Sequence, residues 1–180
     1  MKLTNIFPPI FAVLCATIVY AVKIPNADTP LFYLVASSSD QSNNLLSVRL
    51  ATTGGGPATL LGSGPFPKWY FWQGSLVIVD PSGGSNPWRP LINTSLTGNG
   101  CSKSGALSFV LGSSTNKCAK YGSFQIQSFS ENSQLGAKLV VDYTGGFYAC
   151  GSNKDIYYKV STNDGPSNCN PVDLYTVPVA

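Results

Sequence analysis

The chain has 180 residues, with eleven Lys and Arg residues against eight Asp and Glu residues, and it contains no histidine. The lack of histidine excludes Ser-His and Cys-His nucleophilic pairs and metal sites with imidazole ligands. Charged residues make up only 11% of the chain and form no basic run, so the composition argues against a nucleic-acid partner.

The first 21 residues have the features of an export signal. Lys2 supplies a positive start, and an apolar segment over residues 10–21 ends in Ala21. This segment is shorter than a membrane span, and no second apolar run follows it. We therefore expect a cleaved signal peptide (residues 1–21) rather than the alternative, a membrane anchor. The expected mature chain is one secreted domain over residues 22–180, with no membrane partner.

The rest of the chain alternates between short apolar segments and turns rich in Gly, Pro, Ser and Asp, a pattern typical of strands. No window shows the period of an amphipathic helix. In chain order, strands are expected at Leu31–Ala36, Leu45–Leu50, Ala58–Leu61, Trp69–Trp72, Leu76–Val79, Ala106–Leu111, Ser123–Phe129, Leu139–Tyr143, Phe147–Cys150, Ile156–Val160 and Leu174–Val179.

So many short strands predict a single compact all-β domain. A β-trefoil-like architecture is favoured because the length of the domain suits three lobes. Leu31–Val35, Leu107–Leu111 and Phe147–Cys150 form a weak three-part echo and would open those lobes. A β-sandwich is the alternative, because paired sheets tolerate any strand spacing.

Four cysteines remain once Cys15 leaves with the signal: Cys101, Cys118, Cys150 and Cys169. An even set in an exported chain predicts two disulfides, with three pairings open. The local pairing, Cys101 with Cys118 and Cys150 with Cys169, closes the shortest loops and is favoured. Each bridge would stabilise the domain by about 3 kcal/mol. The spacing contains no CxxC knuckle, so no metal site is expected.

Aromatic residues gather in one third of the chain, at Trp69, Tyr70, Phe71, Trp72 and Trp88. Exposed Trp and Tyr rings stack on the apolar faces of sugars, so Trp69, Tyr70, Trp72 and Trp88 are candidate sugar-binding residues. In a strand, Trp69 and Phe71 would point one way and Tyr70 and Trp72 the other. The alternative is that both pairs are buried. Trp88 stands between two prolines and is expected to be the most exposed.

A single sequon, Asn93-Thr94-Ser95, predicts N-glycosylation of Asn93 on an exposed turn. The acidic residues suit turns better than a catalytic site. Glu131, the only glutamate, lies in a polar turn, and Asp142 precedes a Gly-Gly turn. Each could serve a glycosidase only as half of a carboxylate pair. Asp80, Asp155, Asp164 and Asp173 also lie at expected turns or strand ends. We expect no enzyme and no cofactor.

The C-terminal part of the chain resembles a known family. Its segments Phe147-Tyr148-Ala149-Cys150, Ile156-Tyr157-Tyr158-Lys159-Val160 and Asn168-Cys169-Asn170-Pro171-Val172-Asp173-Leu174 are similar to the four-cysteine C-terminal domain of the fungal PIR cell-wall mannoproteins. Gly122-Ser123-Phe124-Gln125-Ile126-Gln127 and Cys101 with Leu107–Leu111 extend the resemblance upstream. The first half, from Phe32-Tyr33-Leu34-Val35-Ala36-Ser37, looks like secreted fungal wall proteins of the PhiA type.

The chain departs from the PIR pattern in two respects. It lacks the internal repeat whose glutamine is esterified to β-1,3-glucan, so that covalent attachment is not implied. The last cysteine of the PIR tail is also missing, because the chain ends Val177-Pro178-Val179-Ala180. The resemblance implies a secreted fungal protein of the cell wall or extracellular space, with no enzymatic activity carried over.

The sequence thus favours a non-enzymatic, disulfide-stabilised structural protein of the cell wall that associates with wall polysaccharide. A secreted effector or protease-inhibitor-like protein is the alternative, with Gly83–Pro90 or Gly112–Lys117 as its presenting loop. A glycan-active enzyme using Asp142 and a second acid is a third, weaker hypothesis. The sequence leaves the oligomeric state open.

Overall fold

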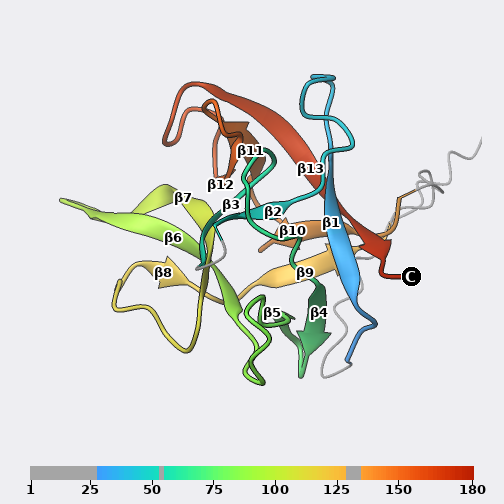
Figure 1. Ribbon diagram of the computed structural model, residues 1–180. Coiled ribbons are helices and arrows are strands. Elements are labelled where there is room, and N and C mark those ends of the chain that lie inside the picture. Colours follow the sequence, from blue (N-terminus) through green and yellow to red (C-terminus); the bar gives the residue numbers. More distant parts are fainter. Residues whose placement is uncertain (1–27, 53–54, 129–134) are drawn as a thin grey trace, which may run out of the picture.

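The computed structural model describes residues 28–52, 55–128 and 135–180 and shows one antiparallel sheet curled into a half-barrel (Figure 1). The described residues contain no helix. The expected signal peptide (residues 1–21) and Glu131 lie outside the described residues. The strands are β1 (Phe32–Ser37), β2 (Arg49–Thr52), β3 (Gly55–Thr59), β4 (Trp69–Trp72), β5 (Ser75–Ile78), β6 (Arg89–Thr97), β7 (Gly100–Val110), β8 (Ala119–Lys120), β9 (Phe124–Gln127), β10 (Lys138–Val141), β11 (Gly146–Cys150), β12 (Asp155–Lys159) and β13 (Cys169–Pro178).

Three antiparallel ladders run around the sheet. Trp69 to Trp72 pair with Ile78 to Ser75, Phe124 to Gln127 with Val141 to Lys138, and Asp173 to Pro178 with Ser37 to Phe32. The ladders join one another through β1–β4 and β10–β13 pairing, and β5 lies against β9. We call the strands β1, β4, β5, β9, β10 and the second half of β13 the ring. Figure 1 shows β1 and β13 side by side, so the two ends of the domain close this ring.

Three hairpins, β2–β3, β6–β7 and β11–β12, form a second layer that we call the cap. Their inner strands pair in a triangle, with β3 on β7, β7 on β12 and β12 on β3. A ring of three ladders closed by three hairpins is the strand order of a β-trefoil. The predicted single all-β domain is confirmed, and the strands form one sheet rather than the two separate sheets of the alternative sandwich.

The lobes of this trefoil do not begin where the sequence echo placed them. They begin at β1, β5 and β10, whereas Leu107–Leu111 includes the end of β7 and Phe147–Cys150 lies in β11. The three-part echo predicted the wrong lobe boundaries because it matched β1, a strand of the ring, with β7 and β11, two strands of the cap. The sequence also gave no sign of β6, because its Pro90 and the polar run Asn93-Thr94-Ser95 look like a loop.

Side-chain alternation places the core between the ring and the cap. In β1, Phe32, Leu34 and Ala36 are buried, while the residues between them are half-buried. This is the period of two that a strand with one buried face requires. The core also takes Leu50 and Ala58 from the first hairpin, Ile92, Leu107 and Phe109 from the second, and Phe147, Ile156 and Tyr158 from the third.

Candidate functional site

The aromatic strand β4 has one buried and one outward face, as its alternation predicts. Trp69 is completely buried and packs its ring on Phe109, with 5.3 Å between ring centroids. Phe71 is buried beside it, Tyr70 is half-buried, and Trp72 has 46% of its surface exposed. The prediction that Trp69 stacks on a sugar is therefore wrong, because its ring is part of the core. Trp72 is the solvent-exposed aromatic residue of this strand.

Trp88 is also buried, with only 9% exposed, and the prediction that it is the most exposed aromatic is wrong. Its backbone pairs with Ile78 through two hydrogen bonds of 3.0 Å, one in each direction. This pairing joins the segment before β6 to β5 and turns the indole inward. The flanking prolines suggested a loop, but here they begin a strand.

A pocket of about 550 Å³ lies beside Trp72. Its walls come from the β4–β5 turn, the segment that leads into β6, and the end of β7. The lining residues are Trp72, Gln73, Ser75, Val77, Asn86, Pro87, Arg89, Leu111 and Gly112. The pocket thus combines an exposed indole with two amide side chains, a hydroxyl and a guanidinium.

Local turns hold these walls in place. Gln73 and Gly74 have φ values of 47° and 76°, the left-handed pair of a two-residue hairpin turn, which fixes Trp72 across from Ser75. The Arg89 guanidinium lies 4.6 Å from the centre of the Tyr121 ring. A cation over an aromatic face is held in position while its remaining N–H groups stay available.

The turn that follows β5 is ordered by Asp80. Its carboxylate accepts hydrogen bonds from the Ser82 side chain and from the Ser82 backbone N–H, the latter at 2.7 Å. These hydrogen bonds lower the pKa of Asp80 from its ordinary value. Asp80 therefore acts as a turn residue, as its position in the sequence indicated, and it does not line the pocket at Trp72.

No carboxylate lines the pocket at Trp72. Asp142 is exposed on a turn at φ 50°, and Asp173 binds Lys138 at 2.6 Å on another face of the molecule. Apolar stacking with amide, hydroxyl and guanidinium hydrogen bonding is the chemistry that recognises a neutral sugar. General acid–base cleavage of that sugar needs two carboxylates across it, which this pocket does not supply.

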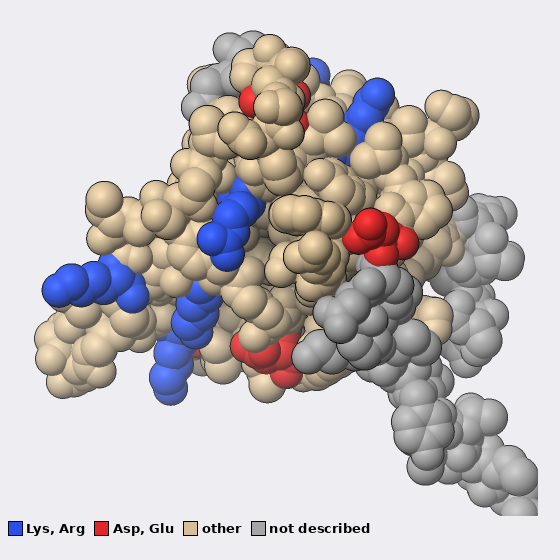
Figure 2. Space-filling view, turned by 90° about the horizontal axis from the view of Figure 1, so that it is seen from below, with Lys and Arg blue, Asp and Glu red and all other residues tan. Residues whose placement is uncertain are grey.

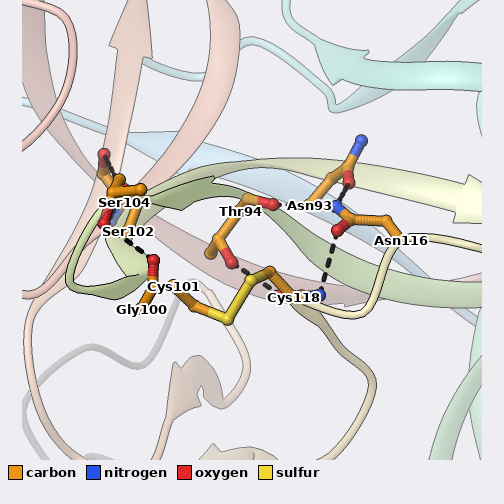
Figure 3. Close-up of a disulfide and its surroundings, with 9 residues drawn as sticks. Asn93, Thr94, Gly100, Cys101, Ser102, Ser104, Asn116 and Cys118 are labelled. Atoms are coloured by element: carbon orange, nitrogen blue, oxygen red, sulfur yellow. Dashed lines mark hydrogen bonds between the residues drawn. A yellow bond between two sulfur atoms is a disulfide. The ribbon is translucent and has the colours of Figure 1, made fainter.

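Two disulfides confirm the predicted local pairing, and the second joins the neighbouring strands β11 and β13. Cys101 binds Cys118, with 5.4 Å between their Cα atoms, and Cys150 binds Cys169, with 4.1 Å between theirs. Figure 3 shows the first bridge beside Thr94, whose buried hydroxyl donates to the Cys118 carbonyl at 2.6 Å. The bridge anchors the loop over residues 112–117 at the rim of the pocket.

Asn93 is exposed, but it lies within strand β6 and not on the turn that the sequon suggested. Its carbonyl oxygen accepts a hydrogen bond of 2.7 Å from the Asn116 amide. In Figure 3 the amide nitrogen of Asn93 points away from Asn116. The nitrogen that would carry a glycan is therefore directed outward, and glycosylation of Asn93 stays a prediction.

Charged side chains do not gather into a stripe on the face seen in Figure 2. Basic residues there lie apart from one another on a surface built mostly of uncharged residues. The described part of the chain has no group of three or more Cys, Asp or Glu residues that could hold a metal ion. Within the same residues, no helix is long and apolar enough to span a membrane.

Comparisons with family models, with curated proteins and with solved structures found no match to this chain. The candidate site is therefore interpreted from its own residues.

Proposed function

We propose that this protein is a non-enzymatic, secreted protein of the cell wall or extracellular space that binds wall polysaccharide at the Trp72 pocket. The exposed indole of Trp72 carries the proposal, because it faces an open pocket rimmed by amides and by a guanidinium that an aromatic ring holds. Large exposed aromatics beside polar groups are typical of binding sites. The export signal, the two disulfides and the PIR- and PhiA-like segments support the location.

The proposal is tested by sedimentation of the mature protein with insoluble β-glucan and with chitin. We expect binding to at least one of them, and we expect Trp72→Ala to weaken it by roughly tenfold, which corresponds to about 1.4 kcal/mol. Phe66→Ala is the matched control, because Phe66 is also an exposed ring but lies outside the pocket. Mature protein that stays wholly in the supernatant with both polymers contradicts the proposal.

A secreted inhibitor or effector is the second candidate, and the loop over residues 112–117 favours it. Lys117 and most of this loop are exposed, and Asn116 donates to the Thr94 carbonyl at 2.8 Å. Together with the Cys101–Cys118 bridge, this contact holds the loop in one shape, which suits insertion into a protease cleft. A protease panel assayed with wild type and with Lys117→Ala tests this. Inhibition that Lys117→Ala removes would favour this candidate over sugar binding.

A further inference from the structure

A second, smaller pocket lies at the corresponding place in another lobe. It has a volume of about 290 Å³ and is lined by residues of β9, β10, β11, β12 and β13 and of the β10–β11 turn. The lining residues are Gln127, Lys138, Leu139, Val140, Val141, Tyr143, Thr144, Gly145, Gly146, Phe147, Tyr158 and Asp173.

The register of the ladders relates this pocket to the one at Trp72. In the β4–β5 ladder the outermost pair is Trp72 with Ser75, and in the β9–β10 ladder it is Gln127 with Lys138. Each pair lines its own pocket, and so does the residue two positions further along the second strand, Val77 or Val140. The two pockets are therefore copies of one location in a threefold arrangement, and they open in different directions.

The polar groups of the second pocket suit a single sugar ring. Lys138 Nζ lies 2.6 Å from Asp173 Oδ1, and both side chains remain partly exposed. Together with the Gln127 amide they present donors and acceptors side by side, which matches neighbouring sugar hydroxyls, since each hydroxyl both donates and accepts. Tyr143, with 47% of its surface exposed, supplies the aromatic face.

The turn that carries Tyr143 is strained and tightly held. Asp142 and Tyr143 have φ values of 50° and 53°, a conformation that a bulky side chain such as Tyr rarely adopts and that is enriched at ligand sites. The Asp142 N–H donates to the Ser123 carbonyl at 3.0 Å. The buried Tyr158 hydroxyl donates to the Thr144 carbonyl at 2.7 Å. The backbone on both sides of Tyr143 is thus held in place at the rim before any ligand arrives.

We infer that the Lys138–Tyr143 pocket is a second sugar site, which takes one pyranose unit, and that the molecule cross-links two polysaccharide chains. The inference rests on the proposed function, because both sites would bind the same class of polymer. Two sites that open in different directions cannot both engage one stiff chain. Binding at the second site therefore holds a second polysaccharide chain. Holding two chains at once raises the overall avidity of the protein for the polymer without new contacts at either site.

The test uses the mature protein with soluble β-1,3-glucan and chitin oligosaccharides, and isothermal titration calorimetry gives the stoichiometry. We expect two sites in the wild type, one in Trp72→Ala, one in Lys138→Met and none in the double variant. Turbidity with soluble high-molecular-weight β-1,3-glucan or glycol-chitin is the second readout. We expect it from the wild type and from Phe66→Ala, and we expect its loss in either single-site variant, although each still binds oligosaccharide.

One stoichiometric site that Trp72→Ala abolishes and Lys138→Met leaves unchanged would overturn the inference and leave the proposed function standing. Failure of the wild type to bind any of these sugars would overturn both. Far-UV circular dichroism and thermal unfolding show whether each variant is folded. Tyr143→Gly is a further variant, because it removes the aromatic face while it relieves the backbone strain. If Tyr143→Gly loses second-site binding while its stability is unchanged or raised, Tyr143 has a binding role and not a structural one.

Discussion

The ring and the cap of this domain are held together by different interactions. Two of the three ladders of the ring begin with a buried aromatic residue, Trp69 or Phe124, which pairs with a β-branched residue on the neighbouring strand. Among the described residues, the ring strands hold no fully buried Ser, Thr, Asn or Lys side chain, and their buried polar atoms, Trp69 Nε1 and Gln125 Oε1, have no hydrogen-bond partner. The cap contains most of the buried polar side chains that the structure describes: Thr59, Thr94, Ser104, Ser108 and Lys159. Both disulfides also start from cap strands.

This difference shows at which positions the fold restricts the type of residue and at which positions it does not. The buried ends of the β4–β5 and β9–β10 ladders need apolar volume, and each has an aromatic residue there. The open ends differ, with Trp72 and Ser75 in one lobe and Gln127 and Lys138 in another. Binding chemistry can vary at these open ends because the core does not depend on them.

Trp69→Ala should be the most damaging change in the ring. It removes a fully buried indole from contact with Phe109, so we expect the free energy of unfolding to fall by about 3–5 kcal/mol in urea denaturation. Trp69→Phe should cost much less, because the indole nitrogen has no hydrogen-bond partner to lose. Trp72→Ala, three residues away on the open end, should change stability by about 0.5 kcal/mol or less. Equal losses for Trp69→Ala and Trp72→Ala would contradict the division between buried and open ends.

The cap should depend on its cross-links. Cys150 and Cys169 face each other on β11 and β13 and are separated by 19 residues in sequence. Replacing both with Ser should lower stability by about 3 kcal/mol, because the unfolded chain regains the entropy of that loop. The measurement is urea denaturation of the oxidised double variant beside the wild type. A loss close to zero would mean that apolar contacts alone hold the cap.

Much of this architecture follows from sequence. Apolar runs predicted β1 and β4, and alternation predicted β9 with its buried face. The even set of cysteines predicted two disulfides, and the shortest loops predicted their pairing. The open pocket was not predicted, and of the four candidate sugar-binding residues only Trp72 lines it. The burial of Trp88 could not be predicted, because it depends on pairing with Ile78 across a loop of uncertain length.

No pattern in the sequence predicts the second pocket. Gln127, Lys138, Tyr143 and Asp173 come from four different segments, and only the threefold register brings them together. This register could not be recognised in the sequence, because the lobes have strands at equivalent positions but different residue types in those strands. Aligning the two ladders by their buried aromatic residues, Trp69 and Phe124, would have been the usable signal.

Thr59→Val probes the buried polar groups of the cap with almost no change in shape. Thr59 is fully buried, its hydroxyl donates to the Asn153 carbonyl, and it accepts a hydrogen bond of 3.2 Å from the Leu61 N–H. Valine removes one partner from each backbone group, but the Leu61 N–H still donates to the Asn153 carbonyl at 3.2 Å. We therefore expect a loss of about 0.5–1.5 kcal/mol in chemical denaturation. Thr97→Val is the control, since its hydroxyl bonds the Gly100 carbonyl at an exposed hairpin tip. If Thr59→Val is as harmless as Thr97→Val, hydrogen bonding does not stabilise the cap.

The smallest expected effect concerns Asp155, which pairs with Thr59 where β12 meets β3. Burial raises the pKa of this carboxyl above its ordinary value of 3.8. Hydrogen bonding with the Thr59 side chain lowers the pKa by a smaller amount, so the net change is a rise. Because the folded state holds this proton more tightly than the unfolded chain does, the resulting stabilisation is present below the ordinary pKa. It is lost as the pH rises through the raised pKa. Asp155→Asn should therefore gain slightly in stability relative to the wild type at neutral pH, and the gain should vanish at low pH. Thermal unfolding of both proteins from pH 3 to pH 7 measures this difference. A gain that stays constant over that range would show that the carboxyl keeps its ordinary pKa in the folded cap.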